Sequence, residues 1–135
     1  MSIIEINNLS KSYGKTKALD NVSFNVERGE LFGLIGPDGA GKTTLFRLLT
    51  TLLTPDEGSA TVDGRDIVKD YLNIRSAVGY MPGRFSLYPD LTVEENLEFF
   101  AALFGVTVKE SYDLIAPIYR QIEPFRKRRA GKLSG

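Results

Sequence analysis

A glycine-rich segment carries the clearest chemical pattern of the sequence. It reads Gly36-Pro37-Asp38-Gly39-Ala40-Gly41-Lys42-Thr43 and follows the spacing G-x-x-x-x-G-K-[ST]. Because glycine has no Cβ, successive backbone N–H groups of such a loop can turn toward one anion. This phosphate loop, residues 36–43, is therefore predicted to bind a polyphosphate at the start of a helix near Lys42.

Two side chains at the end of the phosphate loop suit different parts of nucleotide chemistry. The Lys42 ammonium is predicted to neutralise the β and γ phosphates, which makes Lys42 the candidate catalytic residue. The Thr43 hydroxyl is the candidate ligand of Mg²⁺, which bridges the same phosphates. Asp38 lies inside the loop, where a carboxylate repels a triphosphate, so its side chain is expected to point to solvent. Thr44 is either an α-phosphate ligand or an ordinary helix residue.

The segments on both sides of the loop predict the elements that hold it. Residues 31–35 are an almost continuous apolar run, typical of a strand buried on both faces of a parallel sheet. After the loop, apolar residues recur at the spacing of one helix face, namely Leu45, Leu48, Leu49 and Leu52. Strand, loop and helix thus follow in the order that a phosphate-binding loop requires.

The other segments of the first 91 residues predict short strands and turns. Val22, Phe24 and Val26 alternate with polar residues, which indicates a strand buried on one face of an antiparallel sheet. Asp63-Gly64 is a strong hairpin signal. Further strands are predicted at residues 3–6, 59–62, 65–68 and 77–81, and a turn-rich segment at residues 7–16.

Helical patterns dominate from Thr92 onward. Thr92, with Glu95 three positions later, predicts a capping box. The helix that follows is predicted to bury one face, formed by Val93, Leu97, Phe100, Ala101 and Phe104. A second helical pattern, divided by Pro117, is predicted to bury Leu114, Ile115, Ile118, Tyr119 and Ile122. The chain is thus predicted to have two parts, residues 1–91 and residues 92–135.

The composition excludes several classes of function. The sequence has no cysteine and no histidine, and 17 basic residues balance 17 acidic ones. Disulfides, thiolate or imidazole metal sites and Ser–His catalysis within this chain are therefore excluded. Because the net charge is zero, the basic run at residues 126–129 is predicted to be a solvated face, and no nucleic acid partner is expected. No apolar run reaches the roughly 18 residues that span a bilayer.

Together with the phosphate loop, an ordered series of segments resembles the ATP-binding subunit of ABC transporters, of the exporter or multidrug type. The resemblance runs from Ile3 to Gly135. The segments that carry it are Ser12-Tyr13-Gly14, residues 18–24, residues 53–58 followed by Asp63-Gly64, residues 79–82, residues 87–97 and Lys132-Leu133-Ser134-Gly135. The last segment resembles the start of the LSGGQ signature of this family.

The resemblance implies an α/β fold of the P-loop NTPase class, in its ABC ATPase form. Residues 1–91 would form the N-terminal portion of the nucleotide-binding core, with a β-rich subdomain and a partial parallel sheet. Residues 92–135 would begin a helical subdomain that is truncated within the signature. ATP and Mg²⁺ are the implied cofactors. The residues implied to bind them are Tyr13, which would stack on adenine, and Gly36, Pro37, Asp38, Gly39, Ala40, Gly41, Lys42, Thr43 and Thr44, the last as an α-phosphate ligand.

The resemblance also implies a task for the complete protein, which would hydrolyse ATP to power export across a membrane. Its partners would be a membrane permease subunit and a second nucleotide-binding subunit, at the cytoplasmic face of the membrane. Because the acidic strand of the family would follow Gly135, the 135-residue chain alone is expected to bind nucleotide weakly or not at all and not to hydrolyse it. Two alternatives stay open: a soluble ABC ATPase that acts on the ribosome or DNA, and a non-catalytic interaction module.

Position 83 departs from the pattern of the family. A glutamine usually follows the Tyr-x-Pro segment there, where it helps to bind Mg²⁺ and relays to the permease. Gly83 has no side chain that provides a ligand, so this role is not assigned to it.

Overall fold

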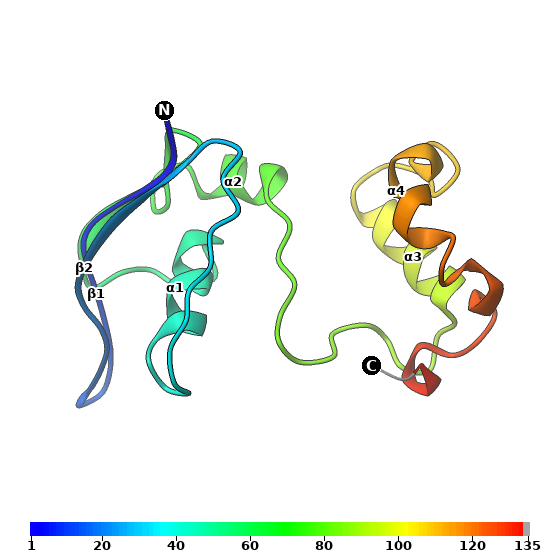
Figure 1. Cartoon of the computed structure of the whole chain (residues 1–135), viewed down its shortest axis with the longest axis horizontal. Coiled ribbons are helices and arrows are strands. Elements are labelled where there is room, and N and C mark those ends of the chain that lie inside the picture. The colour runs from blue at the N-terminus through cyan, green and yellow to red at the C-terminus, as the bar shows by residue number, and fades with distance from the viewer. Residues whose placement is uncertain (134–135) are drawn as a thin grey trace. The chain divides into compact units, whose positions relative to one another are not determined.

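The computed structural model describes residues 1–133 (Figure 1). Their contacts divide the chain into two compact units, Met1–Tyr80 and Met81–Gly135. The first unit contains the phosphate loop, and each unit has its own packing.

A four-stranded antiparallel sheet forms one layer of the first unit. Its strands are β1 (Ser2–Tyr13), β2 (Thr16–Glu27), β3 (Glu57–Val62) and β4 (Arg65–Asp66), in the order β2-β1-β3-β4. The predicted alternation in β2 is confirmed, because Val26 is buried while Val22 and Phe24 pack against the core. The Asp63-Gly64 hairpin between β3 and β4 is also confirmed, although β4 is only two residues long.

The prediction of turns at residues 7–16 was wrong, because β1 continues to Tyr13. Its pairing with β2 shifts register between Ile6 and Leu9. Asn8 and Asn21 both have a φ of 51°, and the Asn8 side-chain amide donates a hydrogen bond of 2.7 Å to the Asn21 side chain. These asparagines, which resemble turn formers in sequence, occupy an irregularity within a long hairpin, where left-handed backbone is tolerated by asparagine.

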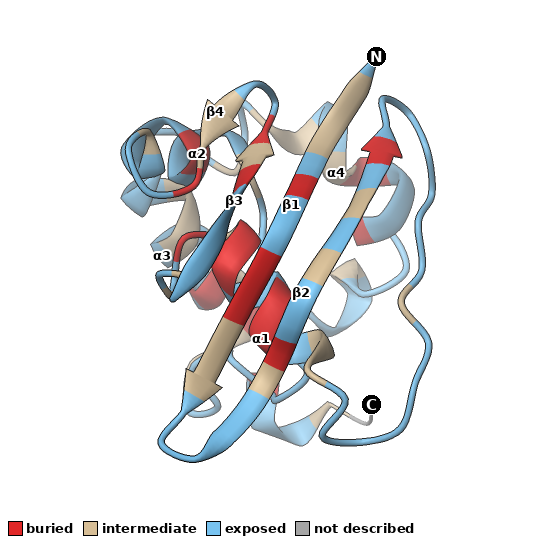
Figure 2. Ribbon diagram, turned by 90° about the vertical axis from the view of Figure 1, so that its left-hand side faces the viewer, coloured by how far each residue is buried: buried red, intermediate tan, exposed pale blue. Residues whose placement is uncertain are grey.

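Helix α1 (Lys42–Leu49) covers one face of this sheet (Figure 2). Leu45, Leu48 and Leu49 are buried against sheet residues such as Leu9, which confirms most of the predicted helix face. Leu52 is 53% exposed because the helix ends before it. The first unit is therefore a sheet and a helix around one apolar core, with the phosphate loop leading into the helix.

A short helix that the sequence did not predict, α2 (Tyr71–Ala77), follows β4. It buries Ile74, and its Arg75 donates hydrogen bonds of 2.8 Å to both the side chain and the backbone of Thr51. The strand predicted at residues 77–81 is absent: Ala77 ends α2 and the residues after it are irregular. One buried residue in seven leaves no clear helical period to detect.

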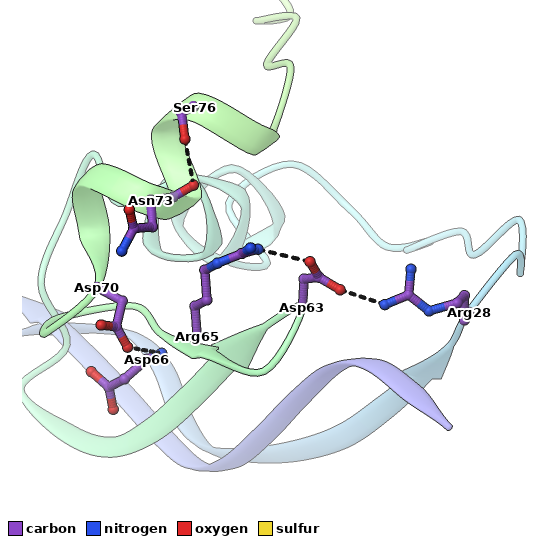
Figure 3. A network of polar contacts seen from close by, with 7 residues as sticks. All are labelled: Arg28, Asp63, Arg65, Asp66, Asp70, Asn73 and Ser76. Atoms are coloured by element: carbon purple, nitrogen blue, oxygen red, sulfur yellow. Dashed lines mark hydrogen bonds and ion pairs between the residues drawn. The ribbon is translucent and has the colours of Figure 1, made fainter.

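Carboxylates fasten the β3–β4 hairpin to its neighbours (Figure 3). Asp63 lies between Arg28, which follows β2, and Arg65, whose guanidinium donates to it at 2.7 Å. These two contacts, Arg28 first, hold the pKa of Asp63 below its ordinary value. Asp70 accepts a hydrogen bond of 3.0 Å from the backbone N–H of Asp66 and so connects the hairpin to α2.

Residues 31–35 do not form the predicted buried strand of a partial parallel sheet. Among the described residues every strand pair is antiparallel, and this segment pairs with no other strand. Phe32 stacks on Phe24 at 5.2 Å and Leu34 packs on the core, whereas Leu31 and Ile35 are fully exposed. The segment thus contacts β2 through side chains, but its backbone pairs with no described strand.

The second unit contains α3 (Val93–Leu103) and α4 (Tyr112–Tyr119), followed by the 3₁₀ turns η1 (Glu123–Phe125) and η2 (Ala130–Lys132). The predicted capping box is confirmed: Thr92 Oγ1 accepts from the Glu95 N–H at 3.1 Å, and Glu95 Oε2 accepts from the Thr92 N–H at 2.7 Å. No helix among residues 1–133 combines the length and the apolar character needed to cross a membrane.

The predicted buried faces of both helices need correction. In α4 the predicted burial of Tyr119 is confirmed and Ala116 is buried as well, whereas Leu114 and Ile118 are 84% and 77% exposed. Tyr112 lies on the same face as the buried pair, since positions 112, 116 and 119 follow the helical period, and its ring meets that of Tyr119 edge-on at 6.1 Å. The aromatic face therefore packs inward in place of the aliphatic one.

In α3 the predicted burial of Val93 is confirmed, but Phe104 is exposed and the polar Asn96 is buried. The Asn96 side chain accepts from the Tyr88 N–H at 2.9 Å and donates to the carbonyls of Tyr88 and Thr92. It thereby connects the preceding loop to the start of α3.

Candidate functional site

The end of β1, the start of β2 and the phosphate loop together line a pocket of about 280 Å³ in the first unit. The pocket is lined by Tyr13, Ala18, Asp38, Gly39, Ala40, Gly41, Lys42, Thr43 and Thr44. Every predicted nucleotide-binding residue except Gly36 and Pro37 therefore lies at one place. Ala18 is the member that the sequence did not single out.

Gly41 explains how the phosphate loop and the β1–β2 hairpin come together. A Cβ at this position would lie 2.2 Å from the Ala18 carbonyl oxygen, which is closer than any side chain tolerates. Its φ of 93° also lies in the left-handed region that favours glycine. The absent side chain lets the loop pack directly on β2, and the hairpin then brings Tyr13 to the rim of the same pocket.

The loop backbone offers a group of free hydrogen-bond donors. Ala40 N–H donates to Pro37 O at 3.2 Å, and Leu45 N–H donates to Gly41 O at 2.9 Å. Among the described residues, no acceptor is present for the N–H groups of Gly39, Gly41, Lys42, Thr43 and Thr44. Amides of the first helical turn carry a partial positive charge and bind anions well.

Lys42 places its charge across the loop. Its ammonium donates to the carbonyl oxygens of Gly36 at 2.5 Å and Pro37 at 2.7 Å. This explains why Gly36 and Pro37 belong to the loop without lining the pocket: their carbonyls hold the lysine. The ammonium is thus fixed at the loop where an entering phosphate would exchange with these carbonyls.

The two threonines that follow differ in exposure. Thr43 is exposed, and its hydroxyl makes no hydrogen bond within the described residues. Thr44 is buried, yet it lines the pocket. Residues 1–133 contain no group of three or more His, Cys, Asp or Glu side chains that would hold a metal ion by itself. For a cation here, Thr43 would offer its exposed hydroxyl, and the oxygens of a bound phosphate chain would supply other ligands, as Mg²⁺ commonly requires.

The two residues before Tyr13 in β1 are held by a carboxylate. Lys11 forms an ion pair with Asp56 at 2.8 Å, and the Ser12 N–H donates to the same carboxylate at 2.7 Å. The Lys11 contact, followed by the Ser12 amide, lowers the pKa of Asp56. Tyr13 itself is 46% exposed, which leaves part of its ring free beside the loop.

The sequence also highlighted two segments outside the phosphate loop. Gly83 belongs to the second unit and is exposed, with open space where a side chain would be. Ser134 and Gly135 of the signature-like segment lie outside the described residues. A larger cavity, of about 470 Å³, lies in the second unit and is lined by α3, α4 and charged side chains of both signs, but it contains none of the predicted site residues.

Comparison with known proteins identifies the family. A sequence profile described as "ABC transporter" matches residues 19–135. The probable multidrug ABC transporter ATP-binding protein YbhF of Escherichia coli K12 is 47% identical over 105 residues, which are 78% of this chain and 18% of that protein. The doxorubicin resistance ATP-binding protein DrrA of Mycobacterium tuberculosis is 39% identical over 98% of this chain and 41% of its own length.

A third relative, the Nod factor export ATP-binding protein I of Paraburkholderia xenovorans, is 38% identical over 98% of this chain and 44% of its own length. The chain therefore spans less than half the length of these curated relatives.

Solved structures give the same result. The ATP-binding subunit of an ABC transporter superposes with a TM-score of 0.83 at 30% identity, over 98% of this chain and 56% of the other. A dimeric ATP-binding cassette bound to ADP and phosphate has a TM-score of 0.80 at 26% identity, over 97% of this chain and 63% of the other. These matches confirm the predicted ABC ATPase class of P-loop NTPase fold. The chain belongs to the ABC transporter family and corresponds to part of its ATP-binding subunit.

Proposed function

We propose that the pocket of the phosphate loop binds ATP with Mg²⁺, and that a protein containing this chain hydrolyses the ATP to power export across a membrane. The observation that carries the proposal is the group of five loop and helix amides without acceptors, beside the Lys42 ammonium and the half-exposed Tyr13 ring.

The phosphate end of the nucleotide would lie against these amides. Lys42 would leave the Gly36 and Pro37 carbonyls and donate to phosphate oxygens, which carry more charge than a carbonyl and form stronger hydrogen bonds. Bound Mg²⁺ would neutralise the phosphate charge, with the Thr43 hydroxyl as its ligand from this chain. Because phosphoryl transfer depends mainly on positioning and charge neutralisation, these groups would stabilise the γ-phosphate during attack by water.

The base would lie toward the hairpin. Tyr13 presents a partly free aromatic ring at the rim of the pocket, and stacking of a base on an aromatic ring contributes about 1–3 kcal/mol. Backbone groups of the loop would hold the phosphates or Lys42, namely those of Gly36, Pro37, Gly39, Ala40 and Gly41. The Thr44 hydroxyl would contact the α-phosphate.

Hydrolysis needs a group that orients the attacking water. Asp38 is the one carboxylate among the described residues that line the pocket, and it lies on the loop itself. We therefore propose that this chain alone binds nucleotide weakly and does not turn it over. Catalysis would then require residues outside the described pocket.

The names of the three relatives suggest the partners and the location that we propose. All three are ATP-binding proteins, named for multidrug transport, doxorubicin resistance and Nod factor export. We propose that the chain acts with a membrane permease and a second ATP-binding subunit at the cytoplasmic face of a membrane. In the basic run, Arg126 lies 3.9 Å from Glu94 and Arg128 lies over the Phe125 ring at 4.9 Å, so two of its four charges have partners within the second unit.

The test is a titration of the isotopically labelled chain with ATP and Mg²⁺ to millimolar concentration, followed by NMR. We expect the amide signals of residues 39–44 to shift progressively, Lys42→Ala to remove most of this response, and Tyr13→Ala to weaken it. Leu52→Ala, at an exposed position after α1, is the matched control and should behave as the parent chain. If the signals of residues 39–44 do not move, or move equally in Lys42→Ala, the proposal is wrong.

A further inference from the structure

Among the described residues, Asp38 places a carboxylate without a direct partner at the pocket of the phosphate loop. The carboxylate is exposed at the pocket lining, where Lys42 is the other charged side chain. Among residues 1–133, Asp38 has neither an ion-pair partner nor a hydrogen-bond donor. The Lys42 ammonium forms no ion pair with it and instead donates to the Gly36 and Pro37 carbonyls.

The loop therefore acts on an anion in two opposing ways. The unpaired amides and the helix start attract phosphate oxygens. The Asp38 carboxylate repels them, and Coulomb repulsion grows in proportion to the charge of the ligand. A divalent cation cancels two negative charges of a triphosphate, so Asp38 opposes metal-free nucleotide more strongly than the metal complex.

We infer that Asp38 is a specificity-determining residue that makes the phosphate loop select the magnesium complex of a nucleoside triphosphate over the metal-free form. The inference rests on the proposed function of the pocket and adds a selection step to it. The selection depends on charge at the loop and requires no contact between Asp38 and the metal.

The matched substitution is Asp38→Asn, which removes the charge and keeps the shape of an exposed side chain. Its control is Glu5→Gln, which removes one negative charge from the same unit. Glu5 is exposed in β1 between Ile4 and Ile6, which face the core, so its side chain lies on the opposite face of the sheet from α1.

The measurement is the dissociation constant of ATP in excess Mg²⁺ and of ATP in EDTA, taken from the amide shifts of residues 39–44. We expect Asp38→Asn to lower the dissociation constant of metal-free ATP about tenfold and that of Mg²⁺–ATP about threefold. Mg²⁺ halves the charge of the nucleotide and so halves the repulsion energy, and half of the energy corresponds to the square root of the tenfold change in affinity. Higher salt should reduce both factors. Glu5→Gln should leave both affinities unchanged.

Three outcomes overturn the inference: an equal change in both affinities, no change in either, or weaker binding of Mg²⁺–ATP alone, which would make Asp38 a metal ligand. In each of these cases the parent chain still binds, so the proposed function stands. If neither the parent chain nor Asp38→Asn responds to either form of ATP, the proposed function fails and the inference fails with it.

Discussion

Replacing Gly41 with alanine tests whether close packing on β2 holds the phosphate loop. The new Cβ would lie 2.2 Å from the Ala18 carbonyl oxygen and 2.9 Å from Leu19 Cδ2. Neither the strand backbone nor the buried Leu19 can yield without disturbing the core. The φ of 93° adds backbone strain of about 1–2 kcal/mol for a residue with a side chain.

Gly39→Ala is the matched control, because it shares the strain without the collision. Gly39 has a φ of 82°, and nothing lies within 4 Å of the Cβ that it would carry. We expect Gly39→Ala to destabilise the first unit by about 1–2 kcal/mol. Gly41→Ala should cost a further 1–3 kcal/mol or so, the usual range for forcing an extra carbon into a packed region.

The assay is urea unfolding followed through amide signals of the first unit, such as those of Leu9 and Leu48, since the two units need not unfold together. Gly41→Ala should also move the signals of Ala18 and Tyr13 without ligand, whereas Gly39→Ala should not. Equal unfolding free energies for the two variants would refute the argument that Ala18 and Gly41 are packed in contact.

Three further outcomes are expected. Leu48→Ala, at a fully buried site, should cost about 3–4 kcal/mol in the same urea assay, and Leu52→Ala less than about 0.5 kcal/mol; similar losses would contradict the assigned core. The Thr92 backbone and side chain lower the pKa of Glu95, so the capping box should stabilise α3 fully above the ordinary value of 4.5 and lose this effect as pH falls through the lowered pKa. The protection of the α3 amides against hydrogen exchange, relative to the intrinsic rate at each pH, should fall over that range in the parent chain and stay constant in Glu95→Gln; the same fall in Glu95→Gln would contradict this. The apolar residues 31–35, whose backbone pairs with no described strand, should promote self-association of the chain. In analytical ultracentrifugation, Leu31→Lys should therefore lower the average mass, and Asn25→Lys, which adds the same charge at an exposed position, should not. A parent chain that sediments as a monomer would contradict this prediction.

Features determined by neighbouring residues could be predicted from the sequence. The phosphate loop, the start of α1 and the Thr92 capping box each depend on residues within eight positions. The Asp63-Gly64 hairpin and the alternation in β2 are equally local. The predicted loop residues meet in one pocket because a glycine loop before a helix positions its own amides.

Features determined by distant partners were predicted poorly. Residues 31–35 have the composition of a buried strand, but a strand needs a neighbour for its backbone, and composition does not supply one. In α4 the burial of Tyr119 was predicted correctly, but Leu114 and Ile118 were also predicted to be buried and are exposed. The rings of Tyr112 and Tyr119 pack together instead, and the Tyr112 hydroxyl donates to Glu123 at 2.9 Å. From hydropathy alone, an aliphatic helix face is expected to be buried in preference to an aromatic face whose hydroxyl needs a polar partner.

The position of Tyr13 shows how a distant contact affects a site that sequence describes only in part. Side chains alternate along a strand, so a regular β1 with Ile6 facing the core would turn Leu9 to the other face. The register shift between Ile6 and Leu9, with Asn8 hydrogen-bonded to Asn21, returns Leu9 to the core. The Lys11–Asp56 ion pair then holds the strand two residues before Tyr13. The adenine side of the proposed site therefore depends on two asparagines and an aspartate outside the phosphate loop. The phosphate side depends on the loop and on its close packing against Ala18 of β2.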